Sequence, residues 1–106
     1  MSERIEMIKK MLAEKGEDIF LTYSLGMELA SAERFDEAAE QFRRCLKLDQ
    51  DYLPAYAELG KALRSTGGTD EAREVFTAGM NLAARSGESH TRDYLQQQLD
   101  SLPERT

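Results

Sequence analysis

Apolar residues recur along this chain at intervals of three and four positions, in segments separated by short polar or glycine-containing stretches. That spacing places them on one face of an α-helix, whereas a half-buried strand would need strict alternation. Ser2 and Asp18 are suitable N-cap residues, and Gly16 follows the first apolar segment as a helix terminator. We therefore expect an all-α fold with about six helices, over residues 2–15, 19–32, 35–48, 53–65, 69–84 and 89–102.

One segment of the sequence occurs twice. Residues 19–52 and 53–86 align with an offset of 34 positions and are identical at ten of them, whereas average residue usage gives about two matches by chance. A repeat of this length is typical of stacked helical units. Gly26 recurs as Gly60 inside a predicted helix, where glycine costs about 1 kcal/mol relative to alanine. We therefore expect both glycines to lie where two helices approach closely.

The remaining segments extend the stack at both ends. Shifted by 34 positions, residues 1–16 align with the second half of a repeat, with Ile8 on Phe42, so we interpret them as a half-repeat helix. Residues 88–102 carry leucines on one face and polar residues on the other, which suits the capping helix that ends a stack. The inward stripe of the first helix is predicted to comprise Ile5, Ile8, Met11 and Leu12.

The second predicted helix has two apolar faces. Its leucines share one face, and Phe20, Tyr23 and Met27 lie on the opposite one. Along the corresponding face, the fourth predicted helix carries Lys61 and Arg64. Since an ordinary surface helix buries one stripe, the extra stripe indicates either a neighbouring helix or second copy that covers it, or a binding surface.

Composition and charge narrow the class of protein. The chain has 106 residues, the length of one domain, and a formal net charge of −6. The acidic balance argues against binding to nucleic acid or to an anionic membrane surface. The single cysteine suits a reducing compartment. Because no segment resembles a signal peptide or a span of about 18 apolar residues, we expect a cytoplasmic protein.

No group of residues with catalytic chemistry is evident in the sequence. His90 is the only histidine, and its polar surroundings at a helix start are typical of a surface position. Cys45 falls on the inward stripe of its helix, which favours a small buried side chain over a nucleophile. Paired acidic residues recur in the first turns of two helices, where they suit the helix dipole. We therefore expect no enzymatic activity, no cofactor and no metal site.

The repeated segment resembles the tetratricopeptide repeat. That family has a period of about 34 residues, with a Leu-Gly pair in the first helix and an Ala-x3-Phe pair in the second. The matching residues are Leu25-Gly26 and Leu59-Gly60 in the first helices, and Ala38-x3-Phe42 and Ala72-x3-Phe76 in the second. Thr22 and Tyr56 stand at the family's tryptophan position, and its final proline is absent. The chain is similar to a small protein of this family, with two repeats and flanking helices.

The resemblance implies antiparallel helix pairs stacked as a right-handed superhelix, in which the first helix of each pair lines a concave groove that binds peptides. On that basis Phe20, Tyr23 and Met27 form the apolar wall of the groove, and Lys61 and Arg64 its charged wall. We expect an interaction module, monomeric or weakly dimeric, that binds a peptide or helical segment carrying acidic residues. The alternative is a self-associating scaffold whose apolar groove face is buried in a homo-oligomer.

Relatives that bind a C-terminal carboxylate differ at the positions that would hold it. In those proteins a lysine and an asparagine stand where this chain has Tyr23 and Met27. Glu58 stands where the next repeat would offer an uncharged amide, and its charge would repel a carboxylate. We therefore do not expect this chain to bind the acidic C-terminal tails that such relatives hold.

Overall fold

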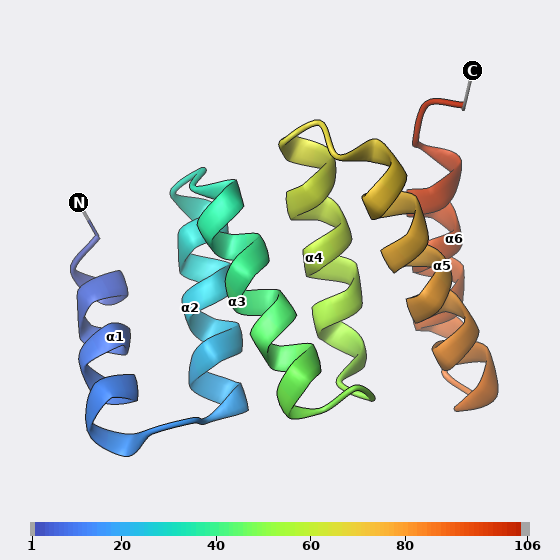
Figure 1. Cartoon of the computed structure of the whole chain (residues 1–106). Coiled ribbons are helices and arrows are strands. Elements are labelled where there is room, and N and C mark those ends of the chain that lie inside the picture. The colour runs from blue at the N-terminus through green and yellow to red at the C-terminus, as the bar shows by residue number, and fades with distance from the viewer. Residues whose placement is uncertain (1, 105–106) are drawn as a thin grey trace.

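The computed structural model describes residues 2–104, and within that range the chain folds into six α-helices and no strand (Figure 1). The helices are α1 (Glu3–Lys15), α2 (Ile19–Ser31), α3 (Phe35–Leu48), α4 (Leu53–Ser65), α5 (Thr69–Arg85) and α6 (Ser89–Asp100). The all-α prediction is confirmed, and the predicted boundaries agree with these to within two residues.

Consecutive helices lie antiparallel, and each packs on the next in the sequence, so that the fold is a row of helices (Figure 1). α2 also contacts α4, which brings the first helices of the two repeats together. The molecule is elongated, with principal extents of 42 × 29 × 19 Å. None of the helices in the described part of the chain is both long and apolar enough to cross a membrane.

Side-chain hydrogen bonds cap the starts of α1 and α2. The Ser2 hydroxyl accepts from the Ile5 N–H at 3.3 Å, and the Asp18 carboxylate accepts from the Leu21 N–H at 2.9 Å. These N-cap bonds satisfy amides that the first turn of a helix leaves unpaired. The Leu21 amide, together with the Lys15 ammonium 3.0 Å away, lowers the pKa of the Asp18 carboxyl.

The recurring glycines lie where the two helices of each repeat cross. A Cβ atom at Gly26 would come within 2.6 Å of the Phe42 ring, and one at Gly60 within 2.3 Å of the Phe76 ring. Both rings are completely buried. Carbon atoms in contact normally lie about 3.5–4.0 Å apart, so a larger residue would force the helices or rings to move. The predicted close approach at both glycines is confirmed.

One prediction for α1 is wrong. The other three residues of the predicted inward stripe are buried or half-buried, but Met11 is 43% exposed. The repeat explains the difference, because Met11 aligns with Cys45, which the first helix of its own pair covers. The Cys45 Sγ lies 3.9 Å from the Ile19 carbonyl oxygen of that helix. No helix within residues 2–104 takes the corresponding place on α1.

At the other end of the row, α6 packs on α5 where a third repeat would begin (Figure 1). Leu95 and Leu102 are buried against the core. Asp93 and Gln96 are exposed. One apolar and one polar face are what a helix needs to end a stack in water.

Candidate functional site

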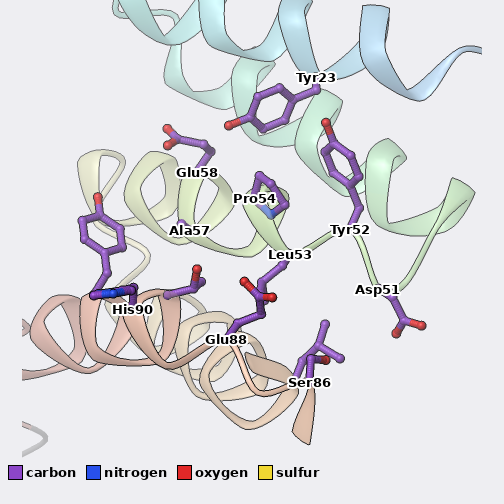
Figure 2. A pocket seen from close by; sticks show the side chains of 13 residues that line it. Tyr23, Asp51, Tyr52, Leu53, Pro54, Ala57, Glu58, Ser86, Glu88 and His90 are labelled. Atoms are coloured by element: carbon purple, nitrogen blue, oxygen red, sulfur yellow. The ribbon is translucent and has the colours of Figure 1, made fainter. Parts of the chain in front are cut away.

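Residues of α2, of α4 and of the start of α6 surround one hollow, with α4 between the other two (Figure 2). Its volume is about 650 Å³. We call this hollow the groove. Its lining includes Tyr23 of α2, Tyr52 before α4, Pro54, Ala57 and Glu58 of α4, and Glu88, His90, Thr91 and Tyr94 at the start of α6.

Three tyrosines, Tyr23, Tyr52 and Tyr94, line the groove. The Tyr23 ring centre lies 5.7 Å from that of Phe42 and 5.5 Å from that of Tyr52, in the tilted and edge-on arrangements that aromatic pairs prefer. Burial, followed by the charge of Glu58, raises the pKa of Tyr23 to about 12. The Tyr23 hydroxyl therefore stays protonated near neutral pH and can donate a hydrogen bond. Tyr94, from α6, is 38% exposed.

Small and rigid side chains of α4 also line the groove. Ala57 lies on α4, Pro54 precedes it by one turn, and both line the groove (Figure 2). Proline near the first turn of a helix sacrifices no hydrogen bond. Ala57 aligns with Tyr23 in the repeat and with Thr91 one period later, and all three line the groove. The groove face therefore follows the repeat from α2 into α6.

The groove is rich in carboxylates. Asp51, Glu58 and Glu88 line it, and none of the described lining residues is lysine or arginine. Lys61 lies just beyond, with its Nζ 3.5 Å from the Glu58 Oε2 and 6.0 Å from the centre of the Tyr94 ring. Burial lowers the pKa of Lys61, but hydrogen bonding to Tyr94 and the charge of Glu58 outweigh it and raise the pKa overall. Negative charge therefore lines the groove, and one protonated ammonium borders it.

The structure separates the five residues predicted from the sequence to form the binding surface. Tyr23 lines the groove, and Lys61 borders it. Arg64 lies farther along α4, where its Nη1 donates to the Gln98 Oε1 at 2.7 Å and to the Ser101 Oγ at 3.1 Å. Its guanidinium thus joins α4 to α6 and is engaged before any ligand arrives.

The other two predicted residues stand elsewhere on α2. Phe20 is 69% exposed and, with Met11 and Leu21, lines a separate hollow of about 690 Å³ where α1 meets α2. Met27 lies one turn after Tyr23 and is 36% exposed, but it is outside the groove lining. The apolar stripe seen in the sequence is therefore divided between two surfaces.

Sequence reasoning missed Tyr52 and Tyr94 as groove residues. Tyr52 precedes α4, in a connection that the helical pattern does not describe. Tyr94 lies on α6, which lacks the Leu-Gly pair of the repeat, so the alignment does not show which face of α6 carries Tyr94. A usable signal was present in the 34-residue spacing of Tyr23, Ala57 and Thr91.

Cys45 and His90, whose side chains are often reactive in enzymes, lie at positions that do not favour catalysis. The Cys45 thiol is completely buried, and burial raises its pKa to about 11, so the reactive thiolate is scarce near neutral pH. His90 is exposed at the edge of the groove. Across residues 2–104, no three His, Cys, Asp or Glu side chains are grouped so that they could hold a metal ion.

Comparisons with known proteins agree with the fold. The family profile of the tetratricopeptide repeat matches residues 29–90. A TPR repeat-containing protein of Pseudomonas aeruginosa is 33% identical over 84 residues, which span 79% of this chain and 80% of that protein. A Bordetella parapertussis protein of known solution structure superposes with a TM-score of 0.82 at 31% identity, over 94% of this chain and 87% of that one. A tetratricopeptide repeat domain protein of Salinibacter ruber superposes with a TM-score of 0.72 at 28% identity, over 78% and 84% of the two chains.

Proposed function

Because the chain belongs to the tetratricopeptide repeat family, we propose that it binds a peptide or helical segment of a partner protein in the groove. Domains of this family are generally protein-interaction modules. The observation that carries the proposal is the convergence of Tyr23, Tyr52 and Tyr94, from three separate segments, on one hollow of about 650 Å³. Tyrosine offers a large rigid ring and a polar tip, and it is a common anchor at binding surfaces.

The charges around the groove favour a ligand that carries both signs. Asp51, Glu58 and Glu88 would attract a basic side chain, which could also stack on a tyrosine ring. Lys61 would meet an acidic residue of the ligand, as expected from the sequence, although it must share that role with Glu58, 3.5 Å away. Since the whole protein has a net charge of −6, basic residues of the ligand would also raise the association rate.

The remaining predicted residues take different parts in this proposal. Met27 extends the wall beyond Tyr23 and would contact a ligand longer than the groove, where its flexible side chain suits adaptable packing. Arg64 would hold the edge of the groove in place through its bonds to Gln98 and Ser101. Phe20 lies outside the groove, and we assign it to a second surface below.

The test begins with a peptide ligand selected from a random phage-displayed library on the immobilised protein. Its affinity is then measured by fluorescence anisotropy for the wild type and for Tyr94→Ala, which removes an exposed ring from the groove. We expect a loss of about 1–3 kcal/mol, the usual cost of truncating an aromatic anchor. Leu48→Ala is the matched control, because Leu48 is 40% exposed on α3 and outside the groove lining.

The two variants distinguish binding in the groove from nonspecific hydrophobic contact. Both remove an exposed apolar side chain, so a nonspecific effect would weaken binding equally in both. Loss of affinity confined to Tyr94→Ala supports the proposal. Undiminished affinity in Tyr94→Ala, combined with a loss of affinity in Leu48→Ala, would show that the peptide binds near α3 and not in the groove.

A further inference from the structure

An apolar patch lies at the N-terminal end of the row of helices, away from the groove. It comprises Met7 and Met11 on α1 and Phe20 at the start of α2, which are 61%, 43% and 69% exposed. Met11 and Phe20 line the same hollow, so the patch is continuous between the two helices. Three large apolar side chains this exposed on neighbouring helices indicate a contact surface.

Comparison with the repeats shows that the exposed face of α1 lacks a covering helix. Met11 aligns with Cys45 and, one period later, with Gly79. Both of these are buried, because the first helix of each pair covers them: Cys45 contacts Ile19 of α2, and a Cβ at Gly79 would lie 2.7 Å from the Cβ of Tyr56 on α4. On α1 the same register position is exposed, so this end of the stack has a face shaped to receive another helix.

The opposite end of the stack does not offer a complementary face. On α6 the side chains of Arg92, Asp93, Gln96 and Gln97 are exposed and polar. Head-to-tail stacking would bury those polar groups against the methionines, which is costly without hydrogen-bond partners. Contact between two N-terminal ends, in contrast, would bury apolar against apolar in a closed, isologous pair.

The charges of α1 match an antiparallel copy of the same helix. If a twofold axis passes between Met7 and Met11, each residue lies opposite the one equally far from that centre, and Met7 meets Met11 of the other protomer. Arg4 then lies opposite Glu14, once on each side of the centre. Arg4, Met7, Met11 and Glu14 share one face of α1 at helical spacing. The Arg4 side chain is 79% exposed, and its one long contact, 3.7 Å from the Arg4 Nε to the Glu28 Oε2, would be exchanged for the contact with Glu14 of the other copy.

We infer that two copies of this chain associate through α1, antiparallel, with the apolar patch at the centre and oppositely charged pairs on both sides. Self-association, which the sequence suggested for the groove face, is thereby placed at a different surface, and the groove stays open in the dimer. A 13-residue helix is about 20 Å long, and one such contact buries less than the roughly 800 Å² per partner of a standard interface. The dimer is therefore weak, with a dissociation constant of about 10–1000 μM.

Charge reversal tests the pairing and its register. In the proposed dimer, position 4 of each copy faces position 14 of the other. Arg4→Glu therefore places a glutamate opposite Glu14 at both contacts, and Glu14→Arg places an arginine opposite Arg4 at both contacts. Reversing two exposed pairs should raise the dissociation constant about tenfold or more in either variant, measured by sedimentation equilibrium from about 10 μM to about 1 mM. An equimolar mixture of the two variants restores both pairs and should dimerise at least as well as the wild type.

Control variants separate the proposed pairing from a change in helix stability or in net charge. Glutamate in the first turn and arginine in the last turn suit the helix dipole, but Arg4→Glu also loses the contact with Glu28 of α2, so circular dichroism and urea unfolding check that both α1 variants keep the fold. Arg92→Glu and Glu40→Arg make the same charge changes on α6 and α3 and should leave the dissociation constant unchanged. A wild type that stays monomeric throughout, a mixture that fails to dimerise, or control variants that match the α1 variants would each overturn the inference.

Discussion

Replacing Gly60 by alanine tests the helix crossing on which the groove depends. The added Cβ would lie 2.3 Å from the Phe76 Cε1, well inside the usual carbon contact of about 3.5–4.0 Å. Phe76 is completely buried, so its ring has no space to withdraw. Overpacking of this kind costs about 1–3 kcal/mol, and an overlap this large belongs in the upper part of that range. Alanine returns about 1 kcal/mol through its higher helix propensity, which leaves a net loss of about 1–2 kcal/mol.

The assay for Gly60→Ala is urea unfolding followed by circular dichroism. The midpoint should fall with an unchanged m-value, because the extent of surface exposed on unfolding stays the same. Each 1 kcal/mol lowers the melting temperature of a domain of this size by about 4–8 °C. Gly26→Ala should be milder, since its Cβ would approach Phe42 to 2.6 Å. Adding Phe76→Leu should recover part of the loss, and a Gly60→Ala protein as stable as the wild type would show that the crossing is not tightly packed.

The remaining predictions concern the groove and the helix caps. Tyr23→Ala should weaken a groove-bound peptide by about 1–3 kcal/mol in anisotropy titrations, and it should also lower the urea midpoint, because the ring packs on Phe42. Lys61→Glu should slow association with a peptide that carries an acidic residue and reduce its salt dependence in stopped-flow measurements. A labelled peptide ending in Glu-Val-Asp should show no saturable binding at micromolar concentration. Asp18→Ala should lower the urea midpoint at pH 7. That difference should shrink as the pH falls below 3.8, since the stabilisation from a carboxylate with a lowered pKa is lost on protonation.

Each of these predictions has a clear contrary result. Full affinity in Tyr23→Ala would place the site outside the groove. An unchanged association rate in Lys61→Glu would show that the ligand's acidic residues bind elsewhere. Saturable binding of the Glu-Val-Asp peptide would mean that the groove holds carboxylates despite Glu58. A stability difference for Asp18→Ala that persists below the lowered pKa would not arise from the carboxylate charge.

The fold was predictable because the repeat constrains it at many positions at once. Gly26 and Gly60 align, and each sits against a phenylalanine that also aligns, so one periodicity fixes both helix pairs and their crossings. The prediction that Met11 faces inward is wrong for a related reason. The same repeat position is buried in α3 and α5 because the first helix of each pair covers it, and α1 has no such helix in the described part of the chain. Helix spacing describes which residues share a face, but it does not say whether a neighbour covers that face.

The site was less predictable because it combines segments that the repeat does not relate. Tyr23 was found from the second apolar stripe on α2, and it does line the groove. Tyr52 and Tyr94 come from a connection and from a helix without the motif, so their convergence with Tyr23 depends on three-dimensional packing. Arg64 is predicted from the sequence to form part of the charged wall of the groove, but its hydrogen bonds to Gln98 and Ser101 depend on where α6 packs, which the sequence pattern does not give.

The most direct test of the proposed function is to map a selected peptide onto the protein by NMR. The 15N-labelled chain is titrated with the peptide recovered from the random library, and shifts of backbone amides are followed to saturation. We expect the largest changes to cluster at Tyr23, Tyr52, Ala57 and Tyr94, on the segments that line the groove. Changes confined to the exposed faces of α3 and α5, with the groove amides unmoved, would contradict binding in the groove.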